Sequence, residues 1–109
     1  MTDEVLQRLA AVIHSRRSES AASSYTRQLI DAGPERCARK LGEEATETVI
    51  AAIGTDPSAL TREAADLVYH LLVLLECRQV PWHDVLAELE RRMGTSGLAE
   101  KAARTTQGP

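Results

Sequence analysis

Apolar residues recur every three or four positions along most of this chain, which is the spacing of one face of an α-helix. The first such face belongs to a helix that Thr2 can cap and that ends near Arg16 or Arg17. Its apolar members are Val5, Leu6, Leu9, Val12 and Ile13. The chain is therefore predicted to begin with an amphipathic helix that buries one side.

A small, polar linker over residues 18–24 separates this helix from a short second one, which Ser24 can cap. Gly33 and Pro34 are predicted to end the second helix and to start a third. Glycine readily adopts the left-handed conformation that stops a helix, and proline fits a first helical turn. The next three helices are predicted over residues 34–53, 57–78 and 82–93, with Asp56 or Ser58 as the cap of the second of these.

The helix over residues 57–78 is apolar on nearly every side. Its apolar residues are Leu67, Val68, Leu71, Leu72, Val73, Leu74 and Leu75. Such a helix has to be covered on more than one side, which a single chain of 109 residues does poorly, so we expect a second copy to help cover it. Since no alternating strand pattern occurs, the predicted fold is all-α, a compact bundle of about four to five helices completed by dimerisation.

Length and composition agree with one helical domain. We place this domain at residues 1–93 and predict a flexible tail over residues 94–109, which is rich in small and polar residues. The chain is 43% apolar and 27% charged, as in ordinary globular proteins, and it contains no Phe, one Trp and two Tyr. A net charge of −3 argues against a general nucleic-acid binder.

Cytoplasmic location is the expectation from the remaining bulk features. Cys37 and Cys77 each lie in a helical pattern and are predicted to be reduced, buried residues rather than a disulfide or a zinc site. The acidic N-terminus lacks the basic start of a signal peptide. The longest apolar run, residues 71–75, falls far below the roughly 18 residues that cross a bilayer.

Charged residues form one stripe on the predicted third helix. At about 100° per residue, Lys40, Glu43, Glu44 and Glu47 fall within a sector roughly 100° wide. Glu44 and Glu47 are three residues apart, so both carboxylates can reach one point. A charged stripe on a single helix is also typical of a solvated face, with Lys40 as an ion-pair partner.

A second acidic pair, Glu63 and Asp66, has the same spacing and comes just before the most apolar segment of the chain. His70 continues its stripe one turn later. Two such helices packed antiparallel bring the four acids across one gap, where they repel each other unless they are protonated, paired or bound to metal. Mg²⁺ suits a few carboxylates together with substrate phosphates. The alternative is ion pairing of the second pair with Arg39 or Arg62.

The two acidic pairs resemble the EExxE…ExxD signature of the all-α nucleoside-triphosphate pyrophosphatase superfamily. The fuller context is similar to one family within it, the phosphoribosyl-ATP pyrophosphohydrolases of histidine biosynthesis, from about Leu6 to Arg92. The matching segments are Ser24-Tyr25-Thr26, Lys40-x-Gly42-Glu43-Glu44-Ala45-x-Glu47 and Asp66-Leu67-x-Tyr69-His70. One departure is the linker, because many relatives carry prolines or a glycine where this chain has residues 19–23.

The resemblance implies Mg²⁺-dependent hydrolysis of phosphoribosyl-ATP to phosphoribosyl-AMP and pyrophosphate, the second step of histidine biosynthesis, by a homodimer or larger homo-oligomer. The implied metal ligands are Glu44, Glu47, Glu63 and Asp66. Glu43 and Glu47 are the implied catalytic residues, with Glu43 orienting or activating water. The implied substrate contacts are Lys40, Tyr25, Arg27 and His70.

Two other functions stay open at this point. The same acidic core suits a house-cleaning pyrophosphatase that acts on a non-standard nucleotide. The chain could instead be a non-catalytic helical dimerisation module whose acids form only a solvated face. Turnover of phosphoribosyl-ATP separates the first alternative from the reaction given above, and stabilisation by Mg²⁺ separates the second.

Overall fold

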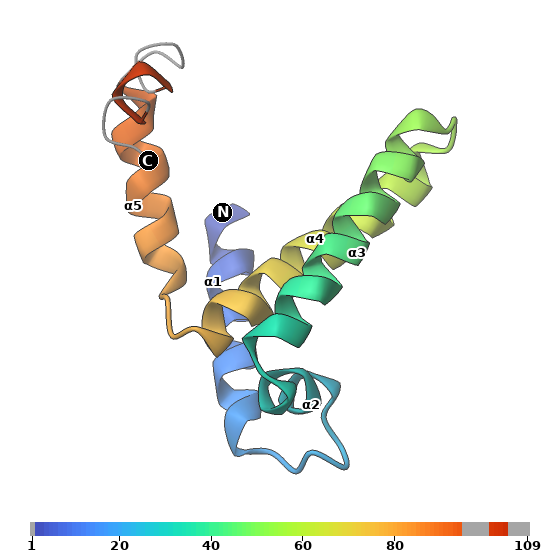
Figure 1. The fold of residues 1–109 in the computed structure, drawn as a ribbon, viewed down its shortest axis with the longest axis vertical. Helices are drawn as coiled ribbons and strands as arrows, with labels where there is room; N and C mark the ends of the chain where they lie inside the picture. The colour runs from blue at the N-terminus through green and yellow to red at the C-terminus, as the bar shows by residue number, and fades with distance from the viewer. Residues whose placement is uncertain (1, 95–100, 105–109) are drawn as a thin grey trace.

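The computed structural model describes residues 2–94 and 101–104, and its regular structure in these ranges is entirely helical (Figure 1). The elements in chain order are α1 (Thr2–Ser15), the short 3₁₀ helix η1 (Arg16–Ser18), α2 (Tyr25–Ala32), α3 (Pro34–Ile53), α4 (Pro57–Cys77) and α5 (Trp82–Met93). No strand occurs within the described ranges. The all-α prediction is therefore confirmed.

Local sequence signals account for where the helices begin and end. The Ser24 hydroxyl accepts the backbone N–H of Arg27 at 3.1 Å at the start of α2. Asp56 accepts the backbone N–H of Ser58 at 2.9 Å and caps α4. Gly33 has a φ of 99°, a left-handed conformation that other residues adopt at a cost, and it lies between α2 and α3. These ends form as predicted because caps and stops act within a few residues.

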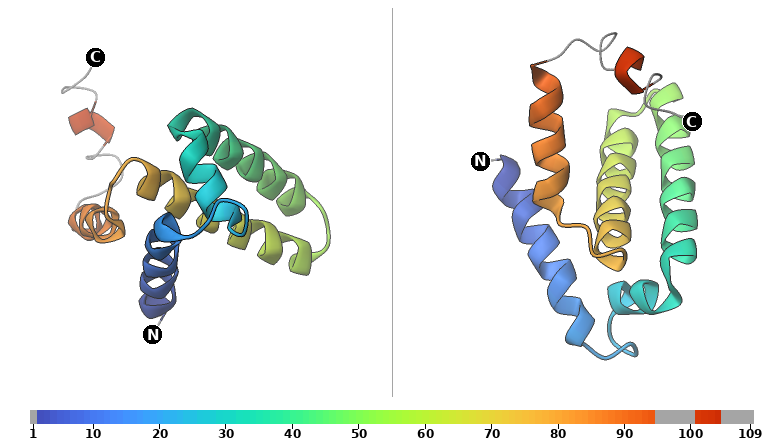
Figure 2. Two further views of the ribbon diagram at one scale, coloured as in Figure 1. Left: turned by 90° about the horizontal axis from the view of Figure 1, so that it is seen from below. Right: turned by 60° about the vertical axis from the view of Figure 1, so that its left-hand side comes forward.

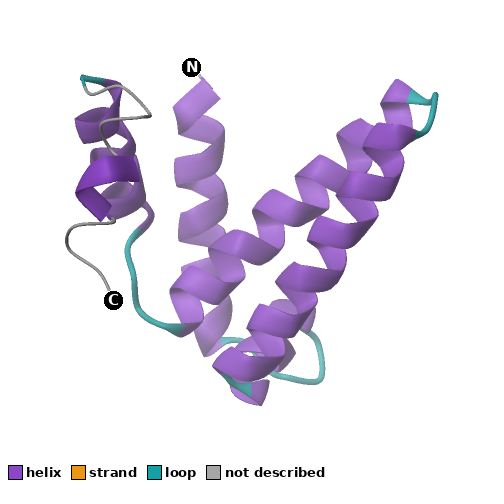
Figure 3. Cartoon of the chain, turned by 45° about the horizontal axis from the view of Figure 1, so that its top comes forward, coloured by secondary structure: helices purple, strands orange, loops and turns teal. Residues whose placement is uncertain are grey.

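The α3 and α4 helices lie side by side as an antiparallel hairpin in every view (Figures 1 and 3). The hydrophobic core lies towards one end of this hairpin, where all of the first four α-helices meet. Its fully buried members are Ile13, Leu29, Cys37, Leu72 and Val73. The other end of the hairpin projects away from the core, so the middle of α3 and α4 stays accessible on its open side.

The α1 helix buries less of its apolar face than the sequence predicts. Ile13 is buried, whereas Val5 and Val12 are 54% and 44% exposed. Figure 2 shows α1 crossing α4 at an angle rather than lying along it, so mainly the C-terminal half of α1 reaches the core. Helical periodicity identifies the apolar face correctly, but it does not tell how much of that face a neighbour covers.

The α5 helix diverges from the hairpin (Figures 1 and 2). None of its residues is fully buried, and Leu89 and Met93 are 45% and 82% exposed. Of the predicted flexible tail, residues 101–104 are helical and exposed, and residues 95–100 and 105–109 lie outside the described residues. In the described ranges no helix is both long and apolar enough to cross a bilayer.

Both cysteines are free; Cys37 is buried, as predicted, whereas Cys77 is only half-buried. The Cys37 thiol donates to the backbone carbonyl of Leu29 at 3.2 Å, at the junction of α2 and α3. Burial raises the pKa of this thiol to about 11, so it is protonated at neutral pH. Cys37 therefore acts as a small core residue.

An ion-pair cluster ties α1 and η1 to the C-terminal end of α4. The Glu76 carboxylate accepts hydrogen bonds from the Arg17 guanidinium and, at 3.0 Å, from the Nδ1 atom of His14. Burial alone would raise the pKa of Glu76, but the hydrogen bonds from Arg17 and His14 hold it below its ordinary value near 4.5. The charged form of Glu76 is therefore favoured by folding.

Replacing Glu76 with Gln is expected to destabilise the fold by about 2 kcal/mol at pH 7, because a charged, largely buried hydrogen-bond acceptor is lost. A carboxyl whose pKa is lowered on folding stabilises the protein above its unfolded pKa, and this contribution fades as pH falls through the folded value. The difference in free energy of unfolding between the variant and the unchanged protein should therefore narrow below about pH 4.5. Thermal unfolding followed by circular dichroism between pH 7 and pH 3 measures it.

The matched control is Glu90→Gln, which removes an exposed carboxylate from α5. It should change the free energy of unfolding by less than about 0.5 kcal/mol at either pH. A Glu76→Gln effect that stayed constant from pH 7 to pH 3 would show that the loss comes from packing rather than from the ion pair.

Candidate active site

The antiparallel pairing of α3 with α4 brings acids from both helices to one place. Carboxylate oxygens of Glu44 on α3 and of Glu63 and Asp66 on α4 all lie within 4.8 Å of one another. Glu44 is buried, Glu63 is half-buried and Asp66 is exposed, so the group opens to solvent on one side. We call Glu44, Glu63 and Asp66 the acidic cluster.

Glu47 adjoins the acidic cluster through Glu44. A hydrogen bond with the Glu47 carboxyl is the main reason that the pKa of Glu44 is raised, and burial and the charge of Asp66 raise it further. Glu47 itself is exposed. The four acids that were expected to bind metal are thus three converging residues and a fourth beside them.

The buried oxygens of the acidic cluster fit a cation. Oε2 of Glu44 and Oε2 of Glu63 are buried and have no hydrogen-bond partner. A buried carboxylate oxygen without a partner is costly, and a bound cation removes that cost. Since all the donors are oxygens, the group suits a hard divalent ion rather than one that prefers nitrogen or sulfur.

Lys40 and His70 approach the acidic cluster from the side of the core. The Lys40 ammonium lies 3.7 Å from Oε2 of Glu43 and 3.8 Å from Oε1 of Glu44. Nε2 of His70 lies 3.7 Å from the same Glu44 oxygen. Burial and then the charge of Lys40 lower the pKa of His70, so the imidazole is neutral at pH 7. A neutral ring leaves Lys40 as the cation beside Glu44.

Contacts between aromatic rings bring the start of α2 next to the acidic cluster. The ring of His70 meets the edge of Tyr69 at a centroid distance of 4.9 Å and that of Tyr25 at 6.3 Å. Buried Thr26 shares a hydrogen bond with the Tyr69 hydroxyl, which fixes the start of α2 against α4. Tyr25 is 51% exposed and interacts with Lys40, whose pKa it raises. The structure thus brings Tyr25, His70 and Lys40 together beside the acidic cluster.

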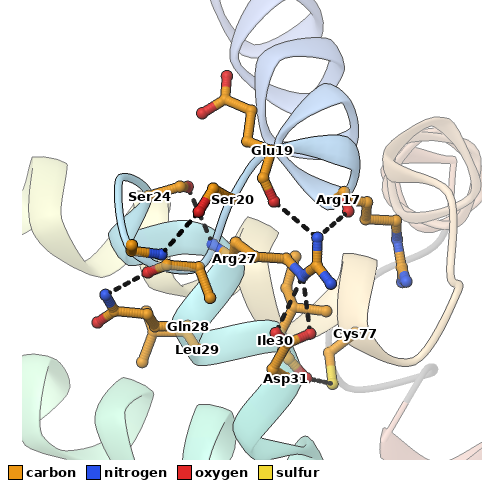
Figure 4. A network of polar contacts seen from close by, with 12 residues as sticks. Arg17, Glu19, Ser20, Ser24, Arg27, Gln28, Leu29, Ile30, Asp31 and Cys77 are labelled. Carbon is orange, nitrogen blue, oxygen red and sulfur yellow. Dashed lines mark hydrogen bonds and ion pairs between the residues drawn. The ribbon is translucent and has the colours of Figure 1, made fainter.

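Arg27 points into a different network (Figure 4). Its Nη1 donates to the backbone carbonyls of Arg17 and Glu19 at 2.6 and 2.7 Å, and its Nε donates to Asp31 at 2.9 Å. These contacts hold the linker between η1 and α2. The structure therefore gives Arg27 a structural contact, and the expected contact with substrate stays a prediction.

Glu43 differs from Glu44 in exposure. Its side chain is 54% exposed and its described partner is Lys40, so it borders the acidic cluster without joining it. Tyr69, Thr26 and Thr48 are contacts that the sequence analysis did not assign. Thr48 follows Glu44 by one helical turn, and that spacing is the signal by which it could have been found.

The cavity of about 610 Å³ between α1, the end of α4 and α5 is separate from the acidic cluster. Its lining includes His14, Arg17, Glu76 and Trp82, and it contains no residue of the acidic cluster. The acidic cluster therefore opens to solvent on the α3–α4 hairpin and not into this cavity.

The chain is similar to known proteins over most of its length. Residues 6–93 match the family model described as phosphoribosyl-ATP pyrophosphohydrolase. A protein of Cereibacter sphaeroides (strain ATCC 17025) named phosphoribosyl-ATP pyrophosphatase is 54% identical to this chain, and the match covers 92% of this chain and 97% of the relative. The protein of the same name in Jannaschia sp. is 56% identical, over 91% of this chain and 97% of the relative. That of Agrobacterium fabrum is 55% identical, over 93% of this chain and 94% of the relative.

Replacing Glu44 with Gln is expected to raise the melting temperature of the metal-free protein at pH 7 by about 2–5 °C, equivalent to somewhat under 1 kcal/mol. An acid whose pKa is raised on folding destabilises the fold above its unfolded pKa, and this cost increases as pH rises through the folded value. The gain should therefore be largest at neutral pH and vanish below about pH 4.5. Thermal unfolding in EDTA measures it.

Glu47→Gln provides a second test of the same repulsion, since Glu47 contributes most to the raised pKa of Glu44. It should also stabilise the metal-free protein at pH 7. A lower melting temperature for Glu44→Gln at pH 7 would show that the ion pairs with Lys40 and His70 outweigh the repulsion between the acids.

Proposed function

Since the chain belongs to the phosphoribosyl-ATP pyrophosphohydrolase family, we propose that it hydrolyses phosphoribosyl-ATP to phosphoribosyl-AMP and pyrophosphate with Mg²⁺, the second step of histidine biosynthesis. The names of relatives at 54–56% identity support the substrate. The observation that carries the proposal on structural grounds is the pair of buried, unpartnered oxygens on Glu44 and Glu63, two acids whose carboxylates converge from neighbouring helices.

The proposed metal ligands are Glu44, Glu63 and Asp66, with Glu47 beside them. When bound, Mg²⁺ would neutralise charge on the triphosphate and on the departing pyrophosphate. The acidic cluster is preorganised for an ion, because α3 and α4 fix its carboxylates on facing sides of one hairpin. Mg²⁺ keeps several positions for water and phosphate, which suits a group that opens to solvent on one side.

The remaining site residues are proposed to bind the substrate or to orient the attacking water. Lys40 is proposed to hold phosphate oxygens, and Tyr25 and His70 to contact the phosphate or sugar beside it. Glu43 is proposed to orient the attacking water and take its proton, since its exposed carboxylate borders the acidic cluster. Arg27 is also proposed to contact substrate, while its Nη1 atom keeps its hydrogen bonds to the carbonyls of the linker.

Purified protein is expected to release pyrophosphate from phosphoribosyl-ATP when Mg²⁺ is present and to stop when EDTA is added. Glu47→Gln should lower turnover by about 100- to 1,000-fold, because it removes a charge that helps to place the cation. A coupled pyrophosphate assay measures both, with a panel of standard and modified nucleoside triphosphates run alongside.

The control for this assay is Glu35→Gln, which removes an exposed carboxylate from the first turn of α3, outside the acidic cluster. Its turnover should stay within about twofold of the unchanged protein. Hydrolysis of the panel without hydrolysis of phosphoribosyl-ATP would support the house-cleaning activity instead. Near-normal turnover by Glu47→Gln would overturn its assignment.

We also propose that the chain works as a cytoplasmic homodimer. In the single chain, large apolar residues of α3 stay open, with Val49, Ile50 and Ile53 59%, 64% and 80% exposed. The radius of gyration is 16.1 Å, above the roughly 13 Å of a compact domain of this length, because α5 diverges. A second copy of the chain can cover the exposed apolar residues of α3. The two free cysteines fit a reducing compartment.

Light scattering coupled to gel filtration is expected to give twice the mass of the chain. Ile50→Glu should shift the protein towards the monomer, because it puts a charge into the proposed contact, and Glu90→Gln on α5 should leave the mass unchanged. A monomer at the concentrations used for the activity assay would contradict the homodimer.

A further inference from the structure

Thr48 links the two helices that carry the acidic cluster. Its hydroxyl lies 2.7 Å from the backbone carbonyl oxygen of Glu44, one turn earlier on α3, and 3.2 Å from that of Glu63 on α4. This second contact is a hydrogen bond that crosses from α3 to α4. Its half-buried position between the helices protects it from competition by water.

The two residues that Thr48 contacts are the ones with buried, unpartnered carboxylate oxygens. One hydroxyl therefore contacts the backbone of both Glu44 and Glu63, directly behind the side chains that face each other in the acidic cluster. A slip of α3 along α4 by the rise of one residue would displace these carboxylates relative to each other by about 1.5 Å along the helix axis. Mg²⁺ demands ligand distances near 2.1 Å in octahedral geometry, so its binding is sensitive to such a slip.

Other threonines show what an ordinary helical hydroxyl does here. Thr46 on α3 donates to the backbone carbonyl of Gly42 at 3.1 Å, and Thr61 on α4 donates to that of Pro57 at 3.0 Å. Both contacts stay within one helix, which is a common use of threonine. Thr48 makes the same contact one turn back and adds the contact across to α4, so its position between the helices distinguishes it.

We propose that Thr48 is a positioning residue whose hydroxyl holds α3 and α4 in the register at which the acidic cluster binds a divalent cation. The inference rests on the proposed metal site. The hydroxyl has one proton to share between two carbonyls, and both carbonyls lie within helices that supply their own N–H donors. Loss of the hydroxyl therefore leaves no backbone group unpaired, and the effect falls on register rather than on folding.

The test is a Mg²⁺ titration of the full chain without substrate, with the apparent Kd taken from the rise in melting temperature. Thr48→Val removes the hydroxyl at nearly constant shape and is expected to weaken Mg²⁺ binding about tenfold, as for residues that support metal ligands from behind. The melting temperature without metal should change little. Thr48→Ser keeps the hydroxyl and should bind Mg²⁺ within about twofold of the unchanged protein.

Thr46→Val is the matched control, because it removes a hydroxyl from the same helix that bonds only one turn back. It should leave the Kd for Mg²⁺ unchanged. If Thr48→Val fails to fold, comparison of Thr48→Ala with Thr48→Ser isolates the same oxygen atom. Equal Mg²⁺ affinity in that pair, or in Thr48→Val and the unchanged protein, would overturn the inference.

Two further outcomes separate this inference from the proposed function. If Thr46→Val lost as much Mg²⁺ affinity as Thr48→Val, the role of the contact between helices would be overturned, while the metal site itself would stand. An unchanged protein whose melting temperature does not respond to Mg²⁺ would overturn the metal site and the role of Thr48 together.

Discussion

Repulsion between carboxylates is the constraint on which the rest of this structure depends. The α3–α4 hairpin holds Glu44, Glu63 and Asp66 within 4.8 Å of each other, which disfavours the fully charged state. The hydrogen bond with Glu47, burial, and the charges of Glu47 and Asp66 all raise the pKa of Glu44. Such a group is stable only if other contacts hold the helices together. The core at the end of the hairpin does so, because α4 contributes both Leu72 and Val73 to it.

The 3.6-residue period of α4 lets one helix contribute residues both to the core and to the site. Asp66 and His70 lie one turn apart on the side that faces the site, while Leu72 and Val73 turn towards α1 and α2. The α3 helix works in the same way, with Cys37 in the core and Glu44 two turns further on. Because core and site share two rigid helices, the positions of the acids follow from the packing of the core.

Features set by neighbouring residues could be predicted from the sequence. The caps at Ser24 and Asp56 and the stop at Gly33 act within one turn, so the ends of α2, α3 and α4 follow from local chemistry. The convergence of Glu44 with Glu63 and Asp66 also follows, because spacing by three residues places acids on one face and a short turn makes α3 and α4 antiparallel neighbours.

Features set by contacts between distant residues could not be predicted in this way. Arg27 is engaged by backbone carbonyls of an irregular linker, and no side-chain pattern reveals where those carbonyls point. The exposure of Val5 and Val12 depends on the angle at which α1 crosses α4. The second contact of Thr48 depends on the axial register of two helices, whereas the sequence specifies only which faces meet.

The charge balance of the site gives a physical reason why the proposed hydrolysis would need cations before an anionic substrate can approach. Five carboxylates interact there with one ammonium group, that of Lys40, because Arg27 is held elsewhere and the imidazole of His70 is neutral. The uncompensated charge is negative even when Glu44 carries a proton. A triphosphate is itself strongly anionic, so Coulomb repulsion opposes its binding to the bare acids. In the proposed reaction, divalent ions would reverse the sign of that interaction, so the acids that repel the bare substrate would attract it as a metal complex.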